Sequence, residues 1–144
     1  MYQRILLAYD GSESGQKALL DCRDIAQWSK AELHLIAVRP LSDAAIGIEG
    51  GFVAHVFDDA LEQEYQDILD DGLRRLRESG HTVQGAVLVG ERVDQIVGHA
   101  KKIEADLIVV GHKHLEGWAA RWWQGSSSPA LIERAPCSVL VVIT

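Results

Sequence analysis

The chain has 144 residues, which is the length of one domain, because chains usually divide only beyond about 250–300 residues. Its 21 acidic and 14 basic residues give a formal net charge of −7, with no local Lys/Arg cluster to offset it. This charge excludes a nucleic-acid-binding protein, which needs a basic surface to neutralise phosphates. With 47% hydrophobic and 24% charged residues, we expect an ordinary globular domain over residues 1–144.

The cysteines and the apolar runs predict where the protein resides. Cys22 and Cys137 lie far apart, outside any CxxC or Cys/His pattern, so we expect buried free thiols in a reducing cytoplasm and no metal site. No apolar run approaches the roughly 20 residues of a transmembrane helix, and residues 1–4 do not resemble a signal peptide. We therefore expect a soluble, cytoplasmic protein with no membrane partner.

Short apolar runs alternate with segments whose apolar residues recur at helical spacing. Continuous apolar runs indicate strands buried on both faces. Residues 41–53 are predicted to be irregular, and 112–124 to form a loop or a short helix. The predicted strands lie at 5–9, 33–38, 83–89, 107–110 and 138–143, and the predicted helices around 18–26 and at 55–79, 93–103 and 126–134.

This βαβαβαβαβ order, without a hairpin turn, predicts a parallel sheet covered by helices on both faces. In such sheets, ligands bind beyond the carboxyl ends of the strands, where the strand order reverses. We therefore look for a site on the loops that follow Tyr9, Val38 and Val110.

Asp10-Gly11-Ser12 follows the first predicted strand. The Asp10 carboxylate at a strand end could bind a ribose, an amine or a metal shared with phosphates. Alternatively, Asp10 and Ser12 turn the chain and cap the following helix, as these residue types commonly do. The sequence leaves both interpretations open.

A second group of small polar residues lies around the fourth predicted strand and helix. Gly111 follows that strand, and Gly125, Ser126 and Ser127 precede the helix. Glycine allows close approach, serine hydroxyls donate hydrogen bonds, and a helix start carries free amides, so these residues could form an anion cradle. Helix capping, with Pro129 in the first turn, is the alternative.

Searches for other chemistry find no GxxxxGK[ST], GxGxxG, GxSxG or HExxH motif. His112 and His114 have no third ligand nearby, so we expect surface histidines and no metal site. Trp118, Trp122 and Trp123 form an aromatic segment, for which packing in a core or interface is weighed against a lid over the site.

The last predicted strand is apolar and is expected to lie at an edge of the sheet. An apolar edge strand without charge or proline is normally paired, and pairing with a second copy about a twofold axis would protect both edges. We expect a homodimer through this strand. The residues that would form it are Val139, Leu140, Val141, Val142 and Ile143.

Three ordered motifs resemble the universal stress protein family over essentially the whole chain. They are residues 5–12 (ILLAYDGS), residues 105–111 (ADLIVVG), and Gly125-Ser126 followed by residues 135–142 (APCSVLVV). The resemblance implies a three-layer α/β sandwich, like that of the adenine nucleotide alpha hydrolases, with strand order 3-2-1-4-5. It also implies a cytoplasmic dimer joined through the last strand and a role in surviving stress or growth arrest.

The resemblance further implies a nucleotide site. ATP-binding members carry an aspartate after strand one, a valine near the end of strand two, and a Gly-x2-Gly-x9-Gly-[Ser/Thr] loop. The second glycine is replaced by His114, whose side chain resists a positive φ, and ten residues instead of nine separate it from the third glycine. A cationic His114 could equally assist a phosphate. The other matching positions are Asp10, Val38, Gly111, Gly125 and Ser126.

We therefore expect a regulator that binds ATP or another adenine nucleotide, with or without Mg²⁺, through a variant glycine loop, and that acts on an unidentified regulatory protein. The alternative is a nucleotide-free dimeric interaction module whose crevice is filled by His114 and the tryptophan segment. Apart from Asp10 the sequence offers no residue suited to activate water, so slow ATP hydrolysis is the most enzymatic activity we expect.

Overall fold

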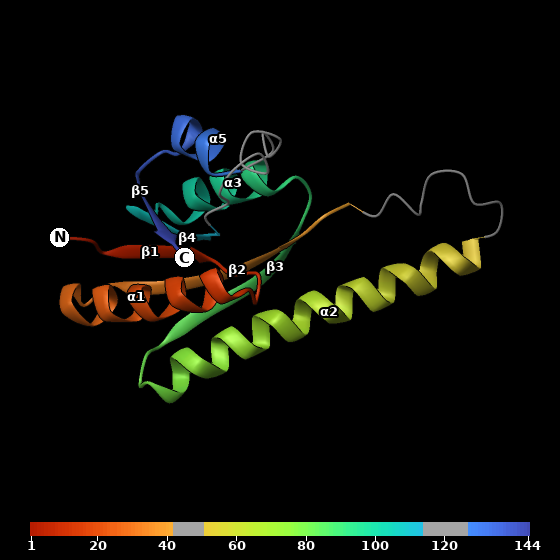
Figure 1. Ribbon diagram of the computed structural model, residues 1–144, viewed down its shortest axis with the longest axis horizontal. Coiled ribbons are helices and arrows are strands. Elements are labelled where there is room, and N and C mark those ends of the chain that lie inside the picture. Colours follow the sequence, from red (N-terminus) through yellow and green to blue (C-terminus); the bar gives the residue numbers. More distant parts are fainter. Residues whose placement is uncertain (42–50, 114–126) are drawn as a thin grey trace.

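The computed structural model describes residues 1–41, 51–113 and 127–144, with the side chains of 51–58 and 127–128 outside this description. Five strands form one parallel sheet in the order β3-β2-β1-β4-β5, which confirms the predicted topology. Figure 1 shows helices on both sides of this sheet. The strands are β1 (Arg4–Ala8), β2 (Glu32–Arg39), β3 (Val83–Val89), β4 (Leu107–His112) and β5 (Ser138–Ile143), and the helices are α1 (Glu13–Ser29), α2 (Gly51–Glu78), α3 (Arg92–Ile103) and α5 (Ser127–Arg134).

The central strand β1 contributes to two separate apolar cores, one on each face of the sheet. Ile5, Leu7 and Tyr9 belong to the core beneath α1 and α2, whereas Leu6 and Ala8 belong to the core beneath α3 and α5. All five are at most 4% exposed. This explains why the run contains no polar residue, since a strand covered on both faces has no solvent-facing side chain.

Backbone pairing aligns the carboxyl ends of the inner strands. Leu7 pairs with Leu35 of β2 and with Val109 of β4, and the Tyr9 amide continues the ladder by donating to the Ile36 carbonyl at 2.8 Å. The loops that follow β1 and β2 therefore leave the sheet at neighbouring points.

Two element boundaries differ from the prediction. Helix α2 begins at Gly51, inside the segment predicted to be irregular, and the remaining residues 42–50 lie outside the described chain. Glycine at position 51 stands at the helix start, where it is tolerated, although glycine in a sequence also indicates a loop.

Strand β4 extends to His112, so Gly111 and His112 belong to the strand and not to the loop after it. They pair with Val142 and Ile143 of β5, and the Thr144 amide donates to the His112 carbonyl at 3.1 Å. The prediction ended the strand at Val110 because glycine is uncommon in strands, but the ladder with β5 continues past it.

The two cysteines differ in their surroundings. Cys22 of α1 is fully buried, which confirms the predicted buried thiol, and burial raises its pKa to about 12. Cys137 is half-buried. In the described part of the chain, no helix is long and apolar enough to cross a membrane.

Gly111 is the point where β4 meets the start of α1. A Cβ atom there would lie 2.4 Å from the Ser14 carbonyl carbon and oxygen and 2.7 Å from the Gly15 amide nitrogen. These are backbone atoms, which cannot rotate away as a side chain can. Glycine therefore allows α1 to pack directly on the end of the sheet.

We predict that Gly111→Ala lowers the free energy of unfolding by about 1–3 kcal/mol, because the added methyl group overpacks this contact. The matched control is Gly98→Ala on the exposed face of α3, where a Cβ would meet nothing within 4 Å. We expect this control to stabilise the protein by about 0.5–1 kcal/mol through helix propensity. Urea unfolding measures both changes, and unaltered stability of Gly111→Ala would contradict the packing argument.

Candidate functional site

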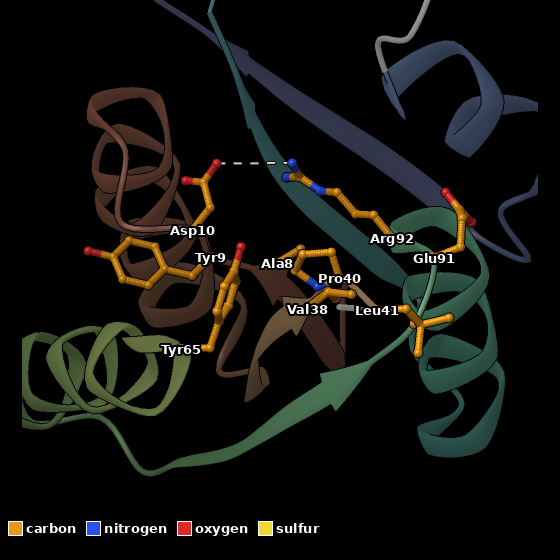
Figure 2. Close-up of a pocket in the computed structure, with 10 residues that line it drawn as sticks. Ala8, Tyr9, Asp10, Val38, Pro40, Leu41, Tyr65, Glu91 and Arg92 are labelled. Atoms are coloured by element: carbon orange, nitrogen blue, oxygen red, sulfur yellow. Dashed lines mark ion pairs between the residues drawn. The ribbon is translucent and has the colours of Figure 1, made fainter. Parts of the chain in front are cut away.

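A cavity of about 520 Å³ opens beyond the carboxyl ends of β1, β2 and β3. Its volume falls within the range of about 300–1,000 Å³ that is typical of small-molecule sites. Figure 2 shows the side chains around it. The lining residues are Ala8, Tyr9, Asp10, Val38, Pro40, Leu41, Tyr65, Gly90, Glu91 and Arg92.

One wall of the cavity is apolar and partly aromatic. Val38, Pro40 and Leu41 come from the end of β2, and Tyr65 comes from α2, with its ring directed into the cavity in Figure 2. Tyr65 is half-buried and packs against the core beneath α2. This wall suits a flat apolar group such as a nucleobase, because aromatic rings stack on such groups.

The two oxygens of Asp10 have different surroundings. Oδ1 accepts hydrogen bonds from the Ser12 amide at 3.0 Å and from the Ser12 hydroxyl at 2.5 Å. The Ser12 hydroxyl oxygen in turn accepts from the Gly15 amide at 3.0 Å and caps α1. Oδ2 instead faces the guanidinium of Arg92, with the Nη1–Oδ2 distance at 4.0 Å. The turn-forming interpretation of Asp10 therefore applies to one oxygen, and the other remains available to a ligand.

The polar side of the cavity is formed by the start of α3. Glu91 caps this helix, since its Oε1 accepts from the Val93 amide at 3.1 Å and its Oε2 from the Asp94 amide at 2.7 Å. Arg92 is the first helical residue, and Figure 2 shows its side chain reaching across toward Asp10. Glu91 thus fixes the helix end that carries the guanidinium group.

Tyr9 lines the cavity but directs its hydroxyl group away toward the outer surface of α2. The hydroxyl donates to Asp71 Oδ2 at 3.0 Å, and the Asp71 carboxylate also binds Arg74 at 2.9 Å and Arg75 at 3.0 Å. Burial and then the Asp71 hydrogen bond raise the pKa of Tyr9 to about 12. Burial alone would raise the pKa of Asp71, but the hydrogen bonds from Tyr9 and the two arginines lower it.

This network predicts alkaline destabilisation. The pKa of Tyr9 is higher in the folded than in the unfolded protein, so its stabilising contribution is complete below pH 10 and is lost as the pH rises from 10 to about 12. We expect a loss of about 1–2 kcal/mol in the free energy of unfolding, less than the full shift implies because Asp71 is partly in solvent.

Denaturant unfolding at several pH values, combined with absorbance at 295 nm, measures this effect. Tyr9→Phe should be less stable at neutral pH but should lack the loss between pH 10 and 12. An identical alkaline loss in both proteins would show that other groups cause it.

The structure brings together part of the predicted nucleotide site. Asp10 and Val38 both line the cavity, whereas Gly111 does not and instead packs against α1. Ser127 begins α5, with its side chain outside the description. The remaining predicted positions, which are His114, Gly125 and Ser126, lie outside the described residues, as does the tryptophan segment.

Sequence reasoning missed Tyr65 and the loop after β3, which carries Gly90 and Arg92. That loop follows an edge strand of the sheet, but the Arg92 side chain reaches across toward Asp10 at the end of β1. Two signals were available: Tyr65 continues the apolar stripe of Leu61 and Ile68 at helical spacing, and a glycine with charged residues follows the third strand.

A parallel α/β sheet with helices on both faces and a cavity at its carboxyl edge defines a protein of the doubly wound class. A sequence model described as the universal stress protein family matches residues 1–142. The chain therefore belongs to the universal stress protein family.

Individual relatives match along nearly the whole chain. Universal stress protein MJ0531 of Methanocaldococcus jannaschii is 31% identical over 143 residues, which cover 99% of this chain and 82% of that protein. Universal stress protein YxiE of Bacillus subtilis is 28% identical, with 99% of both chains covered.

Solved structures show the same fold. A universal stress protein family member from Burkholderia pseudomallei has a TM-score of 0.76 at 26% identity, covering 98% of this chain and 96% of that one. A universal stress protein in complex with cAMP has a TM-score of 0.72 at 25% identity, with coverages of 98% and 97%.

Proposed function

We propose that this universal stress protein binds an adenine nucleotide in the cavity beyond β1, β2 and β3 and acts as a stress-response regulator. The observation that carries the proposal is the pairing, in one cavity, of an aromatic and apolar wall with the outward oxygen of Asp10. The cAMP complex of a relative at 25% identity supports an adenine ligand.

Each wall suits one part of a nucleotide. The base would pack between Val38 and Tyr65, and a ribose hydroxyl would donate to Asp10 Oδ2, whose partner oxygen is held by Ser12. ATP with Mg²⁺ is the form that the family resemblance favours.

We propose a binding and not a catalytic role. Among the described lining residues, Asp10 and Glu91 are the carboxylates that could activate water. Both Glu91 oxygens accept from amides of α3, Asp10 Oδ1 accepts from Ser12, and the proposed site assigns Asp10 Oδ2 to the ribose, so neither group is left as a general base.

Asp10→Asn tests the site directly. Asparagine keeps the oxygen that accepts from Ser12 but replaces Oδ2 with an amide group that cannot accept from a ribose hydroxyl. We expect nucleotide affinity to fall about 10- to 100-fold, as for the loss of a charged hydrogen bond. The matched control is Asp21→Asn on α1, because both aspartate side chains are 42% exposed and both pair with a cation.

Calorimetric titration with ATP, ADP, AMP and cAMP, with and without Mg²⁺, measures this difference. An Asp10→Asn protein that binds as well as Asp21→Asn would remove Asp10 from the site. Absence of both heat and a thermal shift at millimolar nucleotide in the unsubstituted protein would reject the proposed function.

We also propose a homodimer joined through β5. In the described sheet, β5 pairs with β4 on one side only, and its side chains apart from Val142 remain partly or largely exposed, with Ile143 at 57%. A second copy would supply backbone partners to this edge and cover Val139, Leu140 and Val141.

Val141→Lys should shift the protein from dimer to monomer, because a lysine at this edge opposes pairing with its symmetry mate. Val89→Lys is the matched control, since Val89 lies at the end of β3, the opposite edge of the sheet, and is 44% exposed. Sedimentation at micromolar concentration measures the change, with thermal unfolding to verify that both variants fold. A dimer that is split equally by both substitutions would place the interface elsewhere.

A further inference from the structure

Arg92 is the single cation among the described residues that line the cavity. It extends from the first turn of α3 across the opening, and Figure 2 shows its guanidinium group aligned with the Asp10 carboxylate. The two groups are 4.0 Å apart at their nearest atoms, with side chains 37% and 42% exposed. An ion pair this long and this exposed contributes little to stability, so a ligand can replace it readily.

The other charged groups nearby are already engaged. Glu91 uses both oxygens on the amides of α3, which also means that this helix end offers no free amides at those positions to an anion. Asp10 uses Oδ1 on Ser12. In the portion of the chain that the structure describes, Asp10 is the one ion-pair partner of Arg92, and a guanidinium group has five N–H donors, more than this single distant contact uses.

A ligand that enters between these groups must satisfy both of them. Asp10 Oδ2 needs a hydrogen-bond donor, such as a ribose hydroxyl, and Arg92 needs an anion to take the place of the carboxylate. A nucleoside provides only the donor and leaves the guanidinium without its partner. A nucleoside phosphate provides both, and arginine binds phosphate oxygens through two parallel hydrogen bonds.

We propose that Arg92 is the specificity-determining residue that makes this cavity select a nucleoside phosphate over the corresponding nucleoside. The inference rests on the proposed adenine-nucleotide function and adds to it the residue that recognises the charge of the ligand. In the empty cavity Arg92 pairs with Asp10, and in the complex it pairs with the phosphate while Asp10 binds the sugar.

The test compares AMP and adenosine by calorimetric titration against three proteins. In the unsubstituted protein we expect AMP to bind at least about tenfold more tightly than adenosine, as for one charge-assisted contact. Arg92→Gln should remove this preference by weakening AMP and leaving adenosine unchanged. Arg92→Lys, which keeps the charge but not the paired geometry, should retain part of it.

Arg23→Gln is the matched control, because Arg23 of α1 also pairs with a neighbouring aspartate and its side chain is 32% exposed. It removes the same charge away from the cavity and should leave the preference intact. Rising salt concentration should weaken AMP and not adenosine.

The outcomes separate the two proposals. If the unsubstituted protein binds no adenine nucleotide, the proposed function falls and the inference falls with it. If it binds ATP but does not bind AMP more tightly than adenosine, the inference alone is wrong. If both bind but Arg92→Gln leaves the AMP preference in place, or weakens adenosine as much as AMP, the inference alone is wrong.

Discussion

The structure depends on the burial of β1 on both faces and on its pairing with strands on both sides. Its alternate side chains supply the two apolar cores, and its backbone bonds hold β2 and β4 in register. Because this strand ends at the sheet's carboxyl edge, the next polar residue, Asp10, emerges there. The position of the candidate site is thus a consequence of the strand order, which reverses at β1.

Much of this architecture could be predicted from the sequence. All-apolar runs such as Leu107–Val110 indicate strands buried on both faces. Apolar residues at helical spacing indicate that the segments between these runs are helices. The start of α2 and the end of β4 could not be located in this way, because both include glycines that resemble loop residues. At Gly111 the reason for glycine is a contact with Ser14, nearly a hundred positions away in the chain.

The site was only partly predictable for a similar reason. Asp10 and Val38 are adjacent to strand ends and could be found locally, and a family resemblance supported them. Tyr65 and Arg92 enter the cavity from a helix face and from the loop after an edge strand. Their positions in the cavity depend on how far their side chains extend toward the other strand ends, which local sequence spacing does not predict.

The geometry of the Asp10 carboxylate confirms turn formation and leaves the proposed ligand binding compatible with it. One oxygen holds the turn into α1 through Ser12, and the second points into the cavity. The same residue therefore connects the local folding of the α1 start with the chemistry of the site, and a conservative substitution separates the two roles.

This arrangement also divides the entropic cost of recognition unevenly. The two hydrogen bonds from Ser12 fix the Asp10 side chain before any ligand arrives, so binding loses little of its freedom. Arg92 is long, is held only at 4.0 Å, and would lose about 0.5–1.5 kcal/mol of rotamer freedom when immobilised. Under the proposed function, the cavity would thus present a preorganised contact for the sugar and an adaptable one for the anion, which would let it accommodate phosphates at different distances from the ribose.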